Sequence, residues 1–289
     1  MALYAFDGTW NEDQDGHNQD TNVVKFRDAY LENKDAYFPG PGTRFGFLGK
    51  FFGGAFGMGA RQRRKKAFDL FQKKYAAGDT AIDIIGFSRG AAIALDFANR
   101  IQEEGVVDRA TGKKVIPKIR FLGLWDTVPS FGLPKNFLGI PFHDWNIGWK
   151  LKVPANVGRC YHALALDERR GSFEPQYTPE HYEVWFRGHH SDVGGGNKNP
   201  QRNDIALFWM MKKAQAAGVQ LDAAEVTRAA NGRDGKAKLV PPVDLQKDKP
   251  RRIPSQARMH YTVAQCTVNC PATVPADARA ESAADEASP

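Results

Sequence analysis

Short apolar runs alternate with amphipathic segments over most of the chain. Clusters of β-branched and aromatic residues predict strands at residues 2–6, 80–85, 119–124 and 182–186, with a further strand or buried segment at 157–166. Apolar residues at helical spacing predict helices over 23–31, 61–77 and 91–102, and another from Asn203 or Asp204 to Ala217. Because strands alternate with helices, the sequence predicts an α/β fold with a mostly parallel sheet and helices on both faces. Functional residues are then expected at the C-terminal ends of the strands.

Two segments depart from this alternation. Residues 45–59 (FGFLGKFFGGAFGMG) are rich in Phe and Gly, and glycine at that density opposes a regular helix. The segment is interpreted as a loop that packs on the core, covers a pocket or contacts a membrane as a lid. Residues 271–289 consist mainly of Pro, Ala, Ser, Asp and Glu, which predicts a disordered acidic tail. One catalytic domain is therefore expected over 1–265, followed by the tail at 271–289.

Composition places the chain among soluble globular proteins, with 42% hydrophobic and 25% charged residues. No apolar run reaches the length of a transmembrane helix, and the first residues lack the basic segment of a secretory signal peptide. We therefore expect a cytoplasmic location in the producing cell, with any secretion by a signal-peptide-independent route. The net charge of +7 is compatible with an anionic membrane surface. No nucleic-acid-binding motif accompanies the charge, and no nucleic-acid partner is expected.

The chain contains three cysteines, at positions 160, 266 and 270. The odd number and the absence of a zinc-type spacing favour reduced thiols over a structural disulfide.

Ser88 is the candidate nucleophile. It stands in Gly86-Phe87-Ser88-Arg89-Gly90, between a β-branched strand and an Ala-rich helix, as a nucleophile elbow requires. A Gly-x-Ser-x-Gly match alone is weak, and this strand–helix setting makes it specific. The helix N-terminus favours a developing oxyanion, so the backbone N–H of Arg89 is one expected donor. The second donor should come from a loop after another strand, and Thr9 in Gly8-Thr9 is the candidate.

The serine needs a histidine as its base, and the histidine needs an acid that orients its ring. In the sequence of an α/β-hydrolase the acid follows the serine, and the histidine follows the acid. Asp126 follows the strand at 119–124, and His189 and His190 follow the strand at 182–186 in a Gly-flanked loop. These positions alone do not decide whether His189 or His190 is the base. Asp192 is an alternative acid, but a carboxylate two residues from its own histidine is poorly placed to orient the ring. His162, within an apolar run, is interpreted as a core histidine.

Three other functions compete with that of a serine hydrolase. Asp-Gly-Thr after an apolar run is typical of haloacid dehalogenase phosphatases, but their nucleophilic aspartate is replaced by Ala5. His189, His190 and Asp192 could bind a metal, but no further His/Asp cluster at helical spacing supports a catalytic metal. A non-catalytic interaction module on a hydrolase fold is disfavoured because all three triad candidates are present.

Five motifs carry a resemblance to a known family. They are, in order, Phe6-Asp7-Gly8-Thr9-Trp10-Asn11, Gly86-Phe87-Ser88-Arg89-Gly90-Ala91, Leu124-Trp125-Asp126-Thr127-Val128, His162-Ala163-Leu164-Ala165-Leu166-Asp167-Glu168 and Trp185-Phe186-Arg187-Gly188-His189-His190-Ser191-Asp192-Val193-Gly194-Gly195. Over about residues 2–217 the chain resembles the DUF2235 family, the catalytic domain of Tle1-like type VI secretion phospholipase effectors.

The resemblance implies an α/β-hydrolase-like fold and phospholipase or lipase activity at a Ser-Asp-His triad. It maps the histidine onto His190, which immediately precedes Ser-Asp-Val-Gly-Gly, and the acid onto Asp126. The implied partners are a phospholipid or another acyl ester, a peripheral membrane surface, and an immunity or secretion-apparatus protein. No cofactor is expected to be required, and assistance by calcium stays open. We expect this chain to lack the large C-terminal membrane-associating region of the longer effectors, so membrane insertion is not implied. A soluble carboxylesterase is the alternative within the hydrolases.

Overall fold

The computed structural model describes residues 1–8, 19–40, 53–108, 111–129, 149–241, 250–267 and 270–288. The strands are β1 (Ala2–Phe6), β2 (Asn33–Phe38), β3 (Ile82–Phe87), β4 (Val106–Val107), β5 (Lys114–Val115), β6 (Ile119–Trp125), β7 (Val157–Ala165), β8 (Tyr182–Phe186), β9 (Arg258–His260) and β10 (Arg279–Glu281). The α-helices are α1 (Asn22–Ala29), α2 (Gly53–Ala76), α3 (Arg89–Glu104), α4 (His190–Gly194), α5 (Pro200–Ala216) and α6 (Ala223–Gly232). Short 3-10 helices are η2 (Gly171–Phe173), η3 (Tyr261–Gln265) and η4 (Asp285–Ala287).

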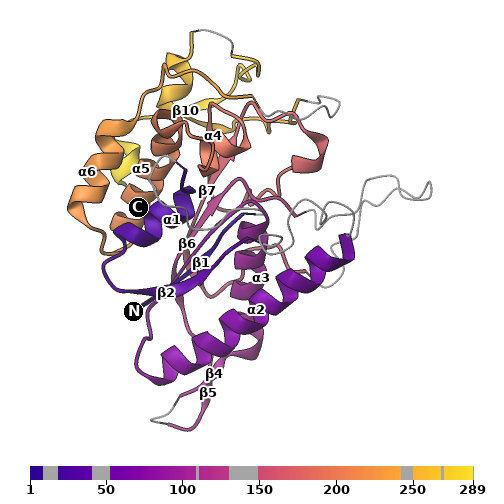
Figure 1. The fold of residues 1–289 in the computed structure, drawn as a ribbon, viewed down its shortest axis with the longest axis vertical. Coiled ribbons are helices and arrows are strands. Elements are labelled where there is room, and N and C mark those ends of the chain that lie inside the picture. Colours follow the sequence, from indigo (N-terminus) through magenta and orange to yellow (C-terminus); the bar gives the residue numbers. More distant parts are fainter. Residues whose placement is uncertain are drawn as a thin grey trace.

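Eight strands form one sheet in the order β10-β9-β8-β7-β6-β3-β1-β2, and neighbouring strands pair in parallel. Helices α2 and α3 pack on one face, whereas α1, α4, α5 and α6 pack on the other (Figure 1). The short strands β4 and β5 form a separate antiparallel pair. The predicted α/β fold is thus confirmed.

The central strand β3 shows why these segments form a sheet with two covered faces. Ile82 and Ile84 pack with α2 and α3, whereas Ile85 and Phe87 pack in the cluster on the opposite face. This alternation follows from the period of two in a strand. A parallel strand buried on both faces is mostly apolar, which explains the isoleucines that predicted it, and its one carboxylate, Asp83, is paired with Arg120.

The predicted strands are confirmed, and helices α2 and α5 begin earlier than predicted. Thr21 caps α1 as expected, because its Oγ1 accepts a hydrogen bond from the Val24 N–H at 3.3 Å. Helix α2 begins at Gly53, so the last part of the Phe/Gly segment is helical and not a loop. Once a helix is nucleated, extending it through a glycine costs only about 1 kcal/mol. The rest of that segment, with Phe51 and Phe52, lies outside the described residues.

Helix α5 begins at Pro200, with Asn199 at its N-cap, and not at the two caps that were predicted. Asn203 and Asp204 lie inside the helix and make tertiary contacts. Asn203 Nδ2 donates to the Ser191 carbonyl at 2.8 Å, and Asp204 pairs with Lys25 at 3.2 Å. These buried partners explain why polar residues that favour caps are tolerated within a helix.

The prediction of a disordered tail after residue 271 is wrong. Strand β10 pairs with β9 and ends the main sheet, so the domain that contains this sheet continues beyond residue 265. Glu281 is buried and accepts hydrogen bonds from Trp209 Nε1 at 3.0 Å and from the Tyr182 hydroxyl at 3.1 Å. Its carboxylate also lies 3.5 Å from the buried Lys213 ammonium. A few buried polar contacts therefore order a segment whose composition is typical of disorder.

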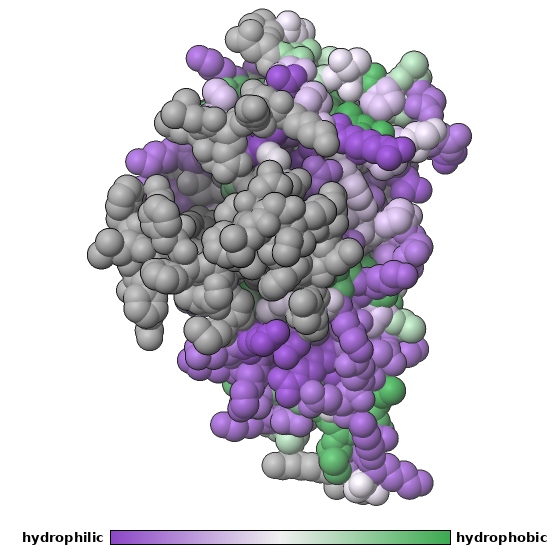
Figure 2. Space-filling model, turned by 90° about the vertical axis from the view of Figure 1, so that its right-hand side faces the viewer, coloured by the Kyte–Doolittle hydropathy of each residue, from purple (hydrophilic) through white to green (hydrophobic). Residues whose placement is uncertain are grey.

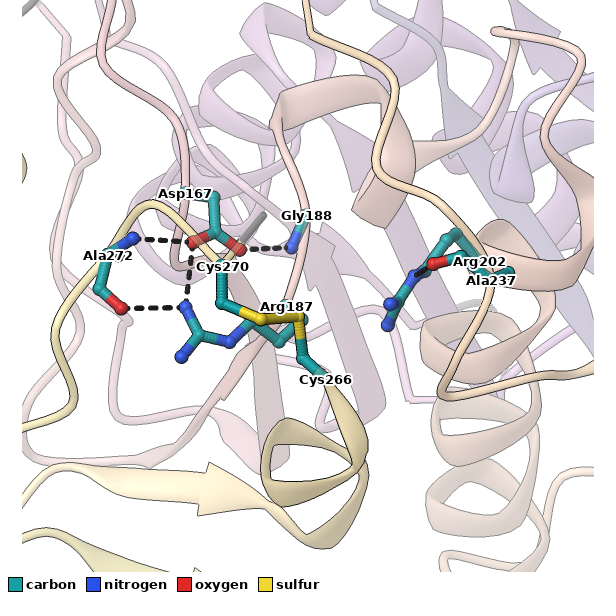
Figure 3. Close-up of a disulfide and its surroundings, with 8 residues drawn as sticks. All are labelled: Asp167, Arg187, Gly188, Arg202, Ala237, Cys266, Cys270 and Ala272. Carbon is teal, nitrogen blue, oxygen red and sulfur yellow. Dashed lines mark hydrogen bonds and ion pairs between the residues drawn. A yellow bond between two sulfur atoms is a disulfide. The ribbon is translucent and has the colours of Figure 1, made fainter. Parts of the chain in front are cut away.

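The expectation of three reduced thiols is also wrong. Cys266 and Cys270 form a disulfide (Figure 3), whereas Cys160 is a buried free thiol. The odd number of cysteines suggested reduced thiols, but the Cα atoms of Cys266 and Cys270 lie 6.3 Å apart, a distance that a disulfide spans. In the described part of the chain, no helix is both long and apolar enough to cross a membrane.

Candidate active site

Ser88 occupies a sharp turn between β3 and α3. Its backbone has φ 58° and ψ −126°, a conformation with positive φ that costs a non-glycine residue about 1–3 kcal/mol. Hydrogen bonds to the end of β6 hold the turn: the Ser88 N–H donates to the Trp125 carbonyl at 3.0 Å, and the Val128 N–H donates to the Ser88 carbonyl at 3.1 Å. The hydroxyl makes no capping bond to α3. This geometry is that of a nucleophile elbow.

The two glycines of the motif are required by close backbone contacts. A Cβ on Gly86 would lie 2.6 Å from the Ala91 Cα, and a Cβ on Gly90 would lie 2.3 Å from the Phe6 carbonyl oxygen. Both distances are shorter than any side chain tolerates. The start of α3 thus packs directly against the end of β1, which fixes the position of Ser88.

Asp126 and His190 are brought together by the ends of β6 and β8. His190 Nδ1 lies 2.5 Å from Asp126 Oδ2, and both residues are buried. The imidazole packs against the rings of Phe87 and Phe173, with centroids 4.6 and 4.8 Å away. Because Phe87 directly precedes Ser88, the imidazole stands beside the elbow. Asp126 itself has φ 41°, so strain is present at this position as well as at Ser88.

The carboxylate of Asp126 accepts hydrogen bonds from four donors. Oδ1 receives the Ala165 N–H at 2.9 Å and Arg251 Nη1 at 2.6 Å, and Oδ2 receives Arg251 Nη2 at 2.9 Å together with His190 Nδ1. Burial alone would raise the pKa of Asp126, but the charge of Arg251 and the hydrogen bonds hold it far below its ordinary value. Asp126 is therefore ionised, and the proton of the imidazole lies on Nδ1.

Burial lowers the pKa of His190 below the ordinary histidine value, although Asp126 acts in the opposite direction. A neutral imidazole with its proton on Nδ1 leaves Nε2 as a proton acceptor. The arrangement can therefore supply a general base at neutral pH.

The alternative candidates His189 and Asp192 belong to a different contact. The His189 N–H donates to Asp192 Oδ2 at 3.0 Å, and the amides of Asn197 and Asn199 each donate to Asp192 Oδ1 at 2.9 Å. Asp192 thus anchors the start of α4, and the carboxylate that reaches His190 is that of Asp126. His162 is a core histidine as interpreted, with hydroxyl groups of Thr127 and Thr178 at its two ring nitrogens.

The loop after β1 was expected to contribute an oxyanion donor. Asp7 Oδ1 accepts the Gly8 N–H at 2.7 Å, so Gly8 is already engaged, and Thr9 lies outside the described residues. Asp7 Oδ2 accepts the hydroxyls of Thr21 and Tyr37 at 2.8 and 2.9 Å. Burial raises the pKa of Asp7 to about 6 despite these hydrogen bonds. Arg89 is the first residue of α3, so its backbone lies at the N-terminus of this helix.

Sequence reasoning missed two charged residues that support the triad candidates. Glu168 accepts the His190 N–H at 3.1 Å and pairs with Arg170 at 2.8 Å. Glu168 lies within one of the five motifs that carry the family resemblance, and this was the only indication in the sequence that it has a role in the site. Arg251 is 125 residues from Asp126 in a segment without periodicity, and nothing in the sequence marks it. In the described segments, no group of three or more His, Cys, Asp or Glu side chains is placed to hold a metal ion.

The disulfide lies beside the loop that leads to His190 (Figure 3). Asp167 Oδ1 accepts Arg187 Nη1 at 2.8 Å and the Ala272 N–H at 3.0 Å, while Oδ2 accepts the Gly188 N–H at 2.7 Å. Ala272 follows Cys270 by two residues, so the disulfide loop is tied to the same carboxylate as the loop before His190. The C-terminal segment is thus part of the support of the site.

The family model of the T6SS phospholipase effector Tle1-like catalytic domain matches residues 3–117 and 107–213. The chain belongs to this family. The match includes Ser88, Asp126 and His190, whereas Arg251 lies beyond it. No curated protein sequence matches this Tle1-like chain significantly.

Two solved structures are similar to the Tle1-like chain. An uncharacterized protein from Pseudomonas aeruginosa is 21% identical with a TM-score of 0.51, and the match covers 80% of this chain and 48% of that one. A Tle1 effector bound to the VgrG spike of the type 6 secretion system is 22% identical with a TM-score of 0.48, covering 68% of this chain and 51% of that one. The chain thus spans about half the length of these structures. The first of them supports the fold.

Proposed function

We propose that this Tle1-like domain hydrolyses acyl esters of phospholipids by a serine mechanism. The observation that carries the proposal is the buried contact between His190 and Asp126 beside the strained elbow of Ser88. Strained backbone is retained where function requires it, and here it presents a hydroxyl at the carboxyl edge of a parallel sheet.

In the proposed reaction, Ser88 Oγ attacks the acyl carbonyl carbon while His190 Nε2 accepts the hydroxyl proton. The negative charge that forms on the carbonyl oxygen is stabilised by the backbone N–H groups of Arg89 and Thr9. Asp126 holds the Nδ1 proton and stabilises the imidazolium. The tetrahedral intermediate collapses, the C–O bond to the alcohol breaks, and His190 returns its proton to the leaving alkoxide. Water then repeats the sequence to release the fatty acid and regenerate Ser88.

Contact with a peripheral membrane surface is the second part of the proposal. On the face shown in Figure 2, the described residues are mainly hydrophilic, with small separated hydrophobic patches. Two cations of α2 are paired with carboxylates, Arg64 with Asp96 at 2.6 Å and Lys65 with Asp69 at 2.9 Å. The candidate for insertion is the Phe/Gly segment 45–59, of which residues 45–52 lie outside the described part of the chain. In the variant Phe51→Ser with Phe52→Ser, vesicle hydrolysis should fall while hydrolysis of a short soluble ester persists.

The description of the family is that of a type VI secretion phospholipase effector, and we propose that this chain acts as such an effector against bacteria. We propose secretion by that signal-peptide-independent route, with a secretion-apparatus protein and an immunity protein as partners. No cofactor is proposed to be required, and hydrolysis should continue in EDTA. Loss of activity in EDTA that calcium restores would contradict this part.

The proposal is tested by acyl release from mixed phospholipid vesicles and by hydrolysis of a short p-nitrophenyl ester. Ser88→Ala and His190→Gln should abolish both activities, whereas Ser255→Ala and His189→Gln should retain them. Ser255 is a suitable control because it is exposed and its hydroxyl donates to Asp277 in the C-terminal segment. Ester hydrolysis without vesicle hydrolysis would identify a soluble carboxylesterase. Folded protein without either activity would favour a non-catalytic interaction module.

A further inference from the structure

Arg251 reaches the candidate site from a segment that lies after the region matched by the family model. Its side chain is 2% exposed, although arginine is rarely buried to this degree without a partner. The guanidinium lies at the carboxyl ends of β6 and β7, where Asp126 and Ala165 are found. The chain therefore places a full positive charge directly behind the carboxylate of the proposed triad.

The contacts of Arg251 fix both oxygens of that carboxylate. Nη1 and Nη2 donate to Asp126 Oδ1 and Oδ2 in a bidentate pair. The same two nitrogens donate to the carbonyls of Ala165 at 2.7 Å and Phe173 at 2.6 Å. Such a planar fork restricts the rotation of the carboxylate, which a single hydrogen bond does not. The carbonyl contact at Phe173 also ties the guanidinium to the residue whose ring packs on His190.

We infer that Arg251 is a positioning residue that fixes the carboxylate of Asp126, partly neutralises it, and so sets the pH range in which His190 acts as a base. This inference rests on the proposed function, because it assigns a role relative to the proposed triad. A carboxylate that shares its charge with a guanidinium stabilises an imidazolium less than a free carboxylate does. His190 therefore remains neutral to lower pH than it would without Arg251.

Other charged groups around His190 act on the same equilibrium. They are Asp126 after β6 and Glu168 after β7, which raise the pKa of His190, and Arg251, which lowers it. Arg170 pairs with Glu168, and His189 and Asp192 lie on the loop and helix of His190 itself. Glu168 is neutralised by Arg170 at 2.8 Å, and Asp192 is held by two asparagine amides. Removing Arg251 would leave Asp126 as the dominant unneutralised charge next to the ring. The pKa of His190 should then rise.

The test follows the titration of the His190 ring by NMR, so it does not depend on turnover. Proteins carry Ser88→Ala and labelled histidine, and the signal of His190 is assigned by its loss in His190→Gln. Arg251→Gln, which removes the charge, should raise the pKa of His190 by about one pH unit. Arg251→Lys, which keeps the charge, should leave it nearly unchanged. An unchanged titration in folded Arg251→Gln protein would overturn the inference.

Arg187→Met is the matched control. Arg187 is also a buried arginine paired with a carboxylate, that of Asp167, and it also ties down the C-terminal segment through Ala272. It does not contact Asp126, so its loss should destabilise the protein without moving the His190 titration. An equal change in both variants would show that loosening of the C-terminal segment, and not the charge of Arg251, is the cause.

Activity measurements separate this inference from the proposed function. These measurements use proteins with Ser88 intact and the soluble ester. In the wild type, kcat/KM should fall at acidic pH as His190 is protonated, and in Arg251→Gln this fall should begin at higher pH. At pH values below the pKa of His190, kcat/KM should therefore be about tenfold lower in Arg251→Gln. Arg251→Lys should leave the pH dependence of kcat/KM unchanged. Its kcat/KM should be at least about tenfold lower at every pH, because lysine cannot form the bidentate hydrogen bonds to Asp126. Wild-type kcat/KM in Arg251→Lys would overturn the positioning role even if Arg251→Gln fails to fold. A shifted titration in a protein without hydrolysis would sustain the role of Arg251 and refute the proposed function.

Discussion

The backbone strain at Ser88 predicts a substitution that stabilises the protein while it abolishes activity. Replacing Ser88 by glycine removes the hydroxyl and also the Cβ that makes φ 58° unfavourable. Replacing it by alanine removes the same hydroxyl but keeps the Cβ. The difference between Ser88→Gly and Ser88→Ala therefore isolates the strain.

The expected magnitude follows from two opposing terms. Relief of the strained conformation should contribute about 1–3 kcal/mol. The greater freedom of glycine in the unfolded chain costs about 0.4–1 kcal/mol. The net gain of Ser88→Gly over Ser88→Ala is therefore about 1 kcal/mol. For a domain of this size, that raises Tm by about 2–4 °C.

The assay compares the Tm of the two variants in the same buffer by calorimetry. Both should be inactive on the p-nitrophenyl ester. Gly78→Ala is a useful control, since that residue has φ 104° and a Cβ there would meet no neighbour. The strain alone should make Gly78→Ala less stable. A Ser88→Gly variant no more stable than Ser88→Ala would refute the strained elbow.

Three further predictions concern buried charges and the disulfide. Because the pKa of Asp7 is raised to about 6, the stability that this group contributes is present at low pH and is lost as pH rises from about 4 through 6. Asp7→Asn should thus raise the free energy of unfolding, measured with urea, by roughly 2–3 kcal/mol near pH 8 but not near pH 4. An equal change at both pH values would contradict the raised pKa of a buried carboxylate. The double variant Cys266→Ser with Cys270→Ser should have a free energy of unfolding about 2 kcal/mol lower than the wild type. A reductant should cause the same loss in the wild type and no further loss in the variant. Glu281→Gln should lower the free energy of unfolding by about 3 kcal/mol, because it leaves the buried Lys213 ammonium without its carboxylate. An unchanged free energy of unfolding would mean that the C-terminal segment is not packed against the domain.

The central fold was predictable because its signals are local. Strand β3 is rich in isoleucine, and the elbow that follows needs glycines at two positions that the sequence shows. Asp126 and His190 could be selected because they follow strands, and parallel strands end at one edge of a sheet. The choice between His189 and His190, however, required the resemblance to a known family, since both residues lie in the same loop.

The C-terminal part was not predictable because its order depends on distant contacts. Strands β9 and β10 contain three residues each, too few for any periodicity. Their stability comes from pairing with the sheet and from partners such as Trp209 for Glu281, 72 residues apart. Arg251 likewise depends on a partner that only the folded chain brings near it. Polar residues in an irregular segment carry no local sign of such a role.

Labelling with a fluorophosphonate probe tests the central claim most directly, because the probe reacts with a serine that an adjacent base has activated. The account predicts one covalent adduct, located by mass spectrometry on the peptide containing Ser88. The adduct should be lost in His190→Gln and retained in His189→Gln. No adduct on the folded wild-type protein, or an adduct on another serine, would contradict the assignment of Ser88, His190 and Asp126 as the catalytic triad.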